Sequence, residues 1–326
     1  MTTISARHDP ELEPAAIRAA LARIHPAFTG SPQFVHEGLS RRAGIPVIVK
    51  VESVNPIRAF KGRGTWLAVR ELAGAGRIGP ELAVVAASTG NFGQGLAFAG
   101  RAFGIPVVVF ADEHGNPTKL DRMRAFGATV IQSGHDFDAA RAASEAYARE
   151  NGAVLLVDGE EPWVATGAGT LAVELTDGVL AGTLPELATA YIPVGNGALI
   201  VGVGAWLRGA APATRVIGVQ SDAAPSMTES WRQGTPIETA TAATFAEGIA
   251  TRVPVSEALD MMVGRVDEMV LVSEAALREA QAELTEALGI TVEGAAAASW
   301  AALLADPGRD AGPALVLITG SNVPPR

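Results

Sequence analysis

The sequence predicts an α/β fold with two open, twisted and mostly parallel sheets that are flanked by helices. Short runs of aliphatic and β-branched residues alternate with longer alanine-rich segments whose apolar residues recur at helical spacing. Nearly continuous apolar runs are typical of parallel strands that helices bury on both faces. The length points to two domains, because 326 residues exceed the roughly 150 that one domain commonly holds.

The expected elements follow from these periods. The predicted strands cover 47–51, 82–86, 106–110, 128–131, 154–157, 190–194, 215–219, 270–272 and 314–318. Helical spacing is clearest at 118–126, 138–150, 199–208 and 274–288, and the alanine run 295–298 suits a small-residue helix face. Three strand–helix units fall within 56–153. We therefore expect 56–153 to be a small inserted α/β domain, and 1–55 plus 154–326 to be a larger one.

Composition excludes several function classes. The net charge of −10 argues against nucleic acid or an anionic membrane as a partner. The absence of cysteine excludes disulfides, cysteine-ligated metals and a thiol nucleophile. The start, 1–14, lacks the layout of a signal peptide, and no apolar run approaches the roughly 18 residues that span a bilayer. We expect a cytoplasmic protein, and the spacing of His, Asp and Glu predicts no metal site.

Two predicted strands end in glycine-rich loops, and ligands of open α/β sheets bind beyond such carboxyl ends. The loop 88–95, Ser-Thr-Gly-Asn-Phe-Gly-Gln-Gly, offers neutral donors before a helix N-terminus, which suits a carboxylate or a phosphate. A helix cap followed by a turn is the alternative. The loop 195–199, Gly-Asn-Gly-Ala-Leu, lets successive amides converge on an anion, although a plain tight turn explains it better when it is taken alone.

Two further segments carry groups of chemical interest. Lys61 stands between Phe60 and Gly62, a neighbourhood that favours a cleft, and a lysine partly removed from water becomes a usable amine nucleophile. A solvated surface lysine is the alternative. The predicted strand 314–318 continues into Thr-Gly-Ser-Asn at 319–322, which offers two hydroxyl groups or forms a capped turn.

These four segments, in this order, resemble the fold-type II pyridoxal-phosphate enzymes. Serine/threonine dehydratases (threonine ammonia-lyases) are the most similar branch, with serine racemases and threonine synthases nearby. The stretch 55–64, Asn-Pro-x-x-x-Phe-Lys-x-Arg-Gly, is similar to the family's Schiff-base lysine motif, and the resemblance extends over about 44–323. It implies a fold like that of the tryptophan synthase β chain, pyridoxal 5′-phosphate in the cleft between the domains, and a homodimer.

The resemblance also implies a role for each matching residue. Lys61 would form the imine with the cofactor and remove the α-proton of an amino acid. Asn91 would meet the cofactor's 3′-oxygen, and Thr319 or Ser321 would face the pyridine nitrogen. Glu293 would line the pocket near the ring, or else cap a helix. The predicted cofactor-binding residues are Phe60, Lys61, Asn91, Gly195, Asn196, Gly197, Ala198, Leu199, Glu293, Thr319 and Ser321. The predicted substrate-carboxylate residues are Ser88, Thr89, Gly90, Asn91 and Phe92.

The expected reaction removes the β-hydroxyl of a serine- or threonine-like amino acid and yields a 2-oxo acid and ammonia. A neutral hydroxyl at the pyridine nitrogen favours elimination over transamination. Racemisation is an alternative because Thr89 could reprotonate the α-carbon. Replacement of a phosphate, as in threonine synthases, would need basic residues, and the candidates are Arg58, Arg63, Lys119 and Arg122.

Two other classes stay open. A catalytically idle ligand-binding homologue would keep the same motifs. A nicotinamide-dependent oxidoreductase would need Asp222, which lies 25 residues beyond Gly197, to bind a ribose. The sequence departs from the family at Phe92, where a histidine is common, and at Gln220, where several relatives carry an acidic metal ligand.

Overall fold

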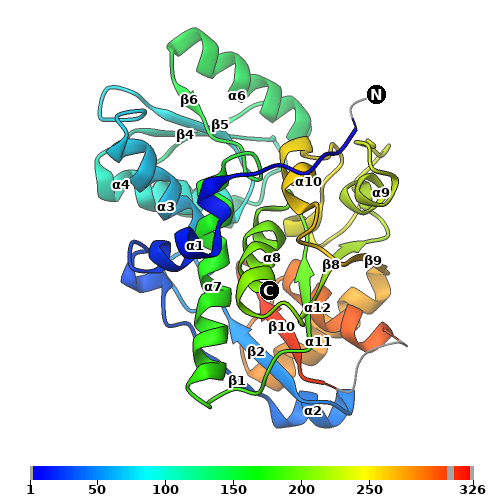
Figure 1. Cartoon of the computed structure of the whole chain (residues 1–326). Coiled ribbons are helices and arrows are strands. Elements are labelled where there is room, and N and C mark those ends of the chain that lie inside the picture. Colours follow the sequence, from blue (N-terminus) through cyan, green and yellow to red (C-terminus); the bar gives the residue numbers. More distant parts are fainter. Residues whose placement is uncertain (1–2, 307–311, 324–326) are drawn as a thin grey trace.

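Two separate sheets organise the computed structural model, which describes residues 3–306 and 312–323 (Figure 1). The larger sheet has the strand order β1-β2-β10-β7-β8-β9, and the smaller has the order β5-β4-β3-β6. Every neighbouring pair is parallel except β1 and β2. The predicted fold class is therefore confirmed. The strands are β1 Gln33–Val35, β2 Val47–Val51, β3 Val84–Ala87, β4 Val107–Ala111, β5 Thr129–Gln132, β6 Val154–Leu155, β7 Thr189–Pro193, β8 Arg215–Ser221, β9 Glu268–Val272 and β10 Ala314–Ile318.

Helices cover both sheets. The α-helices are α1 Pro14–Leu21, α2 Glu37–Ala43, α3 Lys61–Gly74, α4 Asn91–Phe103, α5 Pro117–Ala125, α6 Phe137–Asn151, α7 Pro162–Leu180, α8 Ala198–Ala210, α9 Ser226–Gln233, α10 Ser256–Met262, α11 Glu274–Leu288 and α12 Gly294–Ala305. Short 3₁₀ helices are η1 Pro10–Leu12, η2 Pro26–Phe28 and η3 Glu247–Ile249. Within the described residues, no helix combines the length and the apolarity needed to cross a membrane.

Local signals explain why some bounds agree with the sequence pattern. Helix α11 begins after Ser273, whose hydroxyl accepts the Ala276 N–H at 3.2 Å. It ends before Gly289, which has a φ of 65°. A capping serine and a left-handed glycine are the standard signals for a helix start and stop. The predicted helix 274–288 therefore has the observed bounds.

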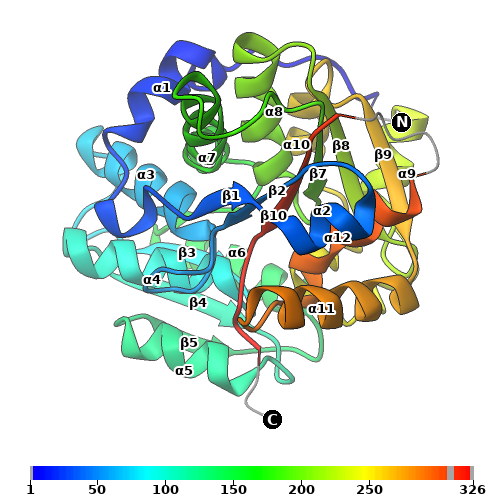
Figure 2. The ribbon, with the colours of Figure 1, turned by 90° about the horizontal axis from the view of Figure 1, so that it is seen from below.

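Helices lie on both faces of the larger sheet (Figure 2), and its central strands β2, β10 and β7 are buried along their whole length. Successive residues of β10 point to opposite sides, as the pleat requires. Leu315 and Leu317 pack in the core that contains α7 and α8, whereas Val316 and Ile318 pack in the core that contains α11 and α12. The alanine run of α12 lets this helix lie against β7 and β10.

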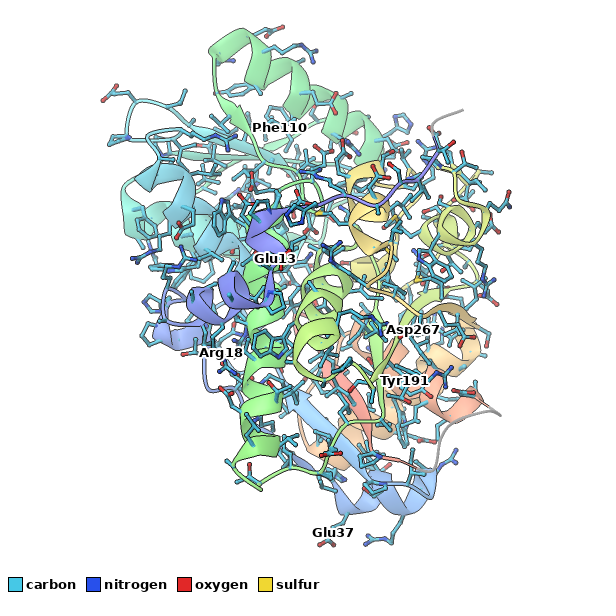
Figure 3. All side chains as sticks on the ribbon, viewed as in Figure 1. Glu13, Arg18, Glu37, Phe110, Tyr191 and Asp267 are labelled. Carbon is cyan, nitrogen blue, oxygen red and sulfur yellow. The ribbon has the colours of Figure 1, made fainter. Side chains whose placement is uncertain are left out.

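The smaller sheet has a similar layering. Helix α6 covers one face, and α4 packs against the other in the same core as α3 and α7. Phe110 of β4, labelled in Figure 3, contacts Tyr147 of α6 with ring centroids 5.4 Å apart and the ring planes tilted by 57°. Figure 3 also labels Tyr191 of β7, which belongs to the other sheet. The two sheets therefore have separate cores on their far sides and a shared one between them.

Most predicted strands shift by one or two residues at their ends, and two strands differ more. Strand β1 was not predicted, because three residues at a sheet edge with Phe34 40% exposed give little apolar pattern. Strand β6 has two residues rather than four, and it pairs in parallel with β3 of the small sheet. The expected boundary after residue 153 assigns this strand to the larger domain. Its partner lies 70 residues earlier, and that pairing is invisible in the local pattern.

Candidate active site

A cleft of about 440 Å³ lies where both sheets end. Its walls include the loops that follow β3, β6, β7 and β10, together with the start of α3. Carboxyl ends of parallel strands are the usual ligand-binding edge of open α/β sheets. The volume is within the range of small-molecule sites.

Lys61 is the first residue of α3, and its side chain lies in this cleft with 16% exposure. Its Nζ is 2.5 Å from Oδ2 of Asp158 and 4.9 Å from the ring centroid of Phe60. Gly62 has a packing role, because a Cβ there would lie 2.2 Å from the ring of Phe28. The glycine therefore fits α3 against η2 instead of opening the backbone beside the lysine.

The loop after β3 supplies one wall of the cleft with residues 88–92. The hydroxyl oxygen of Ser88 accepts the N–H groups of Gly90 at 3.2 Å and Gly93 at 3.0 Å. This serine therefore stabilises the start of α4, as the capping alternative expected. Thr89, Gly90 and Phe92 also line the cleft, and α4 begins at Asn91 with Gly90 as its N-cap.

A buried polar cluster beside this loop joins helices α4 and α5 to residues Glu247 and Glu293. Asn91 Nδ2 donates to Glu293 Oε2 at 2.9 Å, and Lys119 Nζ lies 3.3 Å from Glu293 Oε1. Lys119 also donates to Glu247 at 2.7 Å. Glu293 precedes α12 without capping it through its side chain, so the helix-cap alternative is wrong. It lies in the pocket, as the other interpretation expected.

Burial sets the charge balance of this cluster. Burial raises the pKa of Glu293 above its usual range, although the charge of Lys119 and the hydrogen bond from Asn91 oppose the change. Burial also lowers the pKa of Lys119, but the charges of Glu293 and Glu247 outweigh it, and the net pKa is raised. The ammonium of Lys119 is therefore held between two carboxyl groups.

The glycine-rich loop between β7 and α8 forms the opposite wall with residues 195–199. Gly197 has a φ of +99° and precedes the first turn of α8, whose N–H groups have no partner within the helix. A Cβ on Gly195 would lie 2.4 Å from the carbonyl oxygen of Gly248. The positive φ at 197 and the close backbone approach at 195 both favour glycine. The free amides at this helix N-terminus suit a phosphate. Asn196 accepts the Thr251 hydroxyl at 3.3 Å.

The polar end of β10 is only partly in the cleft. Thr319 lines it and is 5% exposed, whereas Ser321 is not among the lining residues. Ser321 instead donates its backbone N–H to the Arg58 carbonyl at 3.0 Å. A Cβ on Gly320 would lie 1.9 Å from Oε2 of Glu293, so any larger residue at position 320 would have to displace that carboxylate. Of the two candidate hydroxyls at the end of β10, Thr319 is thus the one that lines the cleft.

Several candidates lie elsewhere. Arg63 is fully buried in ion pairs with Glu52 and Glu174. Of the four basic candidates for a second phosphate, only Lys119 is a lining residue. Gln220 is buried, and its Oε1 accepts both the N–H and the hydroxyl of Thr228. Within the described part of the chain, no three His, Asp or Glu side chains gather as a metal ion requires.

Sequence reasoning missed Asp158 and the segment 242–253, which contains η3. The available signal was that Asp158, a polar residue, comes directly after the apolar run 154–157, which contains β6. Gly159 beside it has a φ of +97°, and a Cβ there would lie 2.3 Å from the carbonyl oxygen of Asn196. The loop after β6 therefore packs against the glycine-rich loop 195–199, and this contact holds Asp158 next to Lys61.

The fold and the site together define a two-sheet α/β protein whose cleft holds the amine of Lys61 together with a glycine-rich loop at a helix N-terminus. Residues 24–320 match the family described as pyridoxal-phosphate dependent enzyme, and the chain belongs to that family. Its sequence is 34% identical to the L-threonine ammonia-lyase of Geobacter sulfurreducens over 285 residues, which cover 87% of this chain and 69% of that protein.

Solved structures agree with this assignment. The threonine deaminase of T.th. superposes with a TM-score of 0.85 at 28% identity, over 95% of this chain and 98% of that one. Maize serine racemase superposes with a TM-score of 0.86 at 25% identity, over 96% of this chain and 94% of that one.

The residues of the cleft fit pyridoxal phosphate, the cofactor of the family. Lys61 supplies an amine that would carry the cofactor's aldehyde carbon. The glycines at 195 and 197, which a Cβ would obstruct, would let the backbone hold the phosphate. Phe60, Asn91, Glu293 and Thr319 line the same cleft.

Proposed function

We propose that this protein is an ammonia-lyase that removes the β-hydroxyl of a serine- or threonine-like amino acid and yields a 2-oxo acid and ammonia. The observation that carries the proposal is the placement of Lys61, the 88–92 loop and the 195–199 loop around one cleft. The names of the Geobacter sulfurreducens and T.th. relatives support threonine as a substrate.

Pyridoxal phosphate, when bound, supplies the electron-withdrawing ring that makes the α-proton of an attached amino acid acidic. The Nζ of Lys61 is placed to take that proton, because it is the cleft amine that is not held between two carboxyl groups. Backbone amides near Gly195 and Gly197 orient the phosphate. The amides and hydroxyls at 88–92 orient the substrate carboxylate. Thr319, whose carbonyl accepts the Phe60 N–H at 3.0 Å, offers a neutral hydroxyl in the cleft.

Racemisation is a second candidate activity because Thr89, a lining residue, carries a hydroxyl that could return a proton to the α-carbon. The similarity to maize serine racemase supports it. Replacement of a phosphate is less well supported, since Lys119 is already paired with Glu247 and Glu293. Incubating L-serine in deuterated water and following D-serine beside 2-oxo acid separates racemisation from elimination.

A homodimer in the cytoplasm is the assembly that we infer from the resemblance to dehydratases. Phe34 and Val35 on the edge strand β1, together with Val54, are exposed apolar residues that would suit a contact with a second copy. Light scattering after gel filtration measures the mass in solution. A monomer at micromolar concentration contradicts the dimer.

The test of function starts from the purified protein and pyridoxal phosphate. We expect a visible absorbance band that borohydride fixes and hydroxylamine removes. A panel of β-substituted amino acids should then give 2-oxo acid and ammonia in equal amounts, with serine or threonine active. A band without turnover of any amino acid would indicate that the protein is a catalytically idle, ligand-binding member of the family. Absence of the band overturns the proposal, and reduction of a nicotinamide would then be assayed.

A further inference from the structure

Asp158 is a carboxylate in the wall of the cleft whose two oxygen atoms differ in their partners. Its Oδ2 lies 2.5 Å from Nζ of Lys61. Its Oδ1 is buried and has no hydrogen-bond partner among the described residues. The side chain is 13% exposed. A buried carboxylate oxygen without a donor is unfavourable, so Asp158 depends on the hydrogen bond that its Oδ2 accepts from Lys61.

Loading of the cofactor would also remove the hydrogen bond that Oδ2 of Asp158 accepts. The amine of Lys61 is the group that the cofactor would occupy, and it then no longer donates as an ammonium. Asp158 would lose the one ion pair that it makes in the described structure. Its Oδ2, the oxygen that faces Lys61, would then have no donor, while Oδ1 stays buried. A charge that has lost its partner in a partly buried site costs free energy unless another donor replaces it.

The charge of the whole cleft restricts what that donor can be. The lining side chains include five acidic groups, Asp136, Asp138, Asp158, Glu247 and Glu293, and four basic groups, Lys61, Lys119, Arg141 and Arg252. Arg252 is paired with Asp138, and Lys119 with two glutamates. The cofactor phosphate and the substrate carboxylate add further negative charge. An anionic side chain on the substrate would meet repulsion from Asp158.

We propose that Asp158 is the specificity-determining residue for the substrate side chain. Once the substrate has released Lys61 as the neutral amine that takes the α-proton, the Asp158 carboxylate accepts a hydrogen bond from a donor on the substrate's β-carbon instead of from the Lys61 ammonium. The class of substrate is an amino acid with a β-hydroxyl or a β-ammonium group, and anionic β-substituents are rejected. The inference rests on the proposed function, because it requires an amino acid bound at Lys61.

The experiment compares binding of four amino acids to the cofactor-loaded enzyme. L-Serine carries a hydroxyl, L-2-aminobutyrate replaces it with a methyl group, L-2,3-diaminopropionate carries an ammonium, and L-aspartate carries an anion. The change in visible absorbance on displacement of Lys61 gives each dissociation constant, taken from the first rapid phase where turnover follows. We expect serine to bind about tenfold more tightly than 2-aminobutyrate, since hydrogen bonds to charged acceptors have this strength.

Two variants separate charge from hydrogen bonding. Asp158→Asn keeps an acceptor oxygen but removes the charge, so 2,3-diaminopropionate should lose about tenfold in affinity relative to 2-aminobutyrate while aspartate gains. Asp158→Ala should abolish the advantage of serine over 2-aminobutyrate. The serine and 2,3-diaminopropionate arms decide which donor the wild-type cleft prefers.

Asp136→Asn is the matched control. Asp136 lines the same cleft with a side chain that is 51% exposed, and an asparagine can still cap α6 by accepting the Ala139 N–H. This variant should keep the wild-type order of dissociation constants. If Asp158→Asn and Asp158→Ala bind the cofactor but rank the four amino acids as the wild type does, the inference is overturned. If the wild type forms no lysine-bound cofactor band, the proposed function fails instead.

Discussion

Asn91 hydrogen bonds through both ends of its amide, and so contributes to folding and to the cleft. Its Nδ2 donates to Glu293, and its Oδ1 accepts Asn322 Nδ2 at 2.8 Å. Asn322 also donates to the Ile57 carbonyl at 2.7 Å. A side chain at the first position of α4 therefore connects α12 and the end of β10. Its position in the cleft follows from these two partners.

The substitution Asn91→Ala should lower the affinity for pyridoxal phosphate by more than it lowers stability. The unfolding free energy should fall by about 1 kcal/mol, because a buried acceptor and donor lose their partners. Asn322→Ala removes one of the same hydrogen bonds from a residue outside the cleft lining. We expect it to show the stability loss with near-normal cofactor titration. Equal cofactor losses in both variants would argue that Asn91 acts only through the fold.

Lys61→Ala should abolish the borohydride-reducible band and the release of 2-oxo acid while leaving the circular dichroism spectrum unchanged. Lys61 is at the start of α3, where alanine is a good helix former. Lys119→Ala serves as comparison, since that lysine is also in the cleft but is paired with Glu247 and Glu293. A reducible band that survives in Lys61→Ala and disappears in Lys119→Ala would reverse the assignment.

At the scale of elements, the loop before α8 depends on a close approach to a neighbouring segment. Gly195 lies against Gly248, the middle residue of η3, and Gly197 takes the left-handed conformation at the helix N-cap. Strand β7 on one side and α8 on the other are fully buried along most of their length. The loop between them is therefore held from both ends, and its amides are oriented before any ligand binds.

Gly195→Ala should lower the affinity for pyridoxal phosphate about tenfold. Its Cβ would lie 2.4 Å from the Gly248 oxygen, and relief of such a contact costs about 1–3 kcal/mol or displaces the loop. Gly74→Ala, at the end of α3, adds the same methyl group where no atom lies within 4 Å. Spectroscopic titration of both variants makes the comparison. Wild-type affinity in Gly195→Ala would mean that this loop does not hold the phosphate.

At the scale of the whole molecule, a buried ionic cluster joins strand β2 to helices α3 and α7. Lys50 of β2 and Arg63 of α3 share the carboxylates of Glu52 and Glu174, and three of the four side chains are fully buried. Arg63 follows Lys61 by two residues, so the cluster also fixes the start of α3. Burial raises the pKa of Glu174, but hydrogen bonding and the charges of Arg63 and Lys50 outweigh it and lower the pKa.

Glu174→Gln should lower the unfolding free energy by about 3 kcal/mol at neutral pH, because it leaves buried cations with one carboxylate too few. Asp177→Asn, on the same helix, breaks a half-exposed pair with Arg18 and should cost less than about 1 kcal/mol. A carboxyl whose folded pKa is lowered stabilises the fold above its ordinary pKa of 4.5. That stabilisation is lost as the pH falls through the lower, folded value.

The difference between wild type and Glu174→Gln should therefore be largest near neutral pH and shrink in acid. Urea unfolding at a series of pH values measures it, with Asp177→Asn in parallel. A difference that stays constant down to the acid limit would mean that the Glu174 charge does not stabilise the fold.

The sequence by itself determined the class of fold, the four motifs and the part of the cleft lining that those motifs supply. Helix period, caps and glycine turns depend on neighbours in the chain, so α11 and the loops at 88–95 and 195–199 could be predicted locally. The same reasoning left Thr319 and Ser321 as alternatives, because both hydroxyls follow the same strand.

The tertiary structure alone decided which distant groups meet. Lys61 and Asp158 are 97 residues apart, and Asn91 and Glu293 are 202 apart. Strand β6 pairs with β3 only after α6 has crossed the sheet. No periodic pattern encodes such contacts, because they arise when separate elements bury their apolar faces together and bring their polar ends to one edge. The charge beside the reactive lysine is therefore a property of the packed molecule.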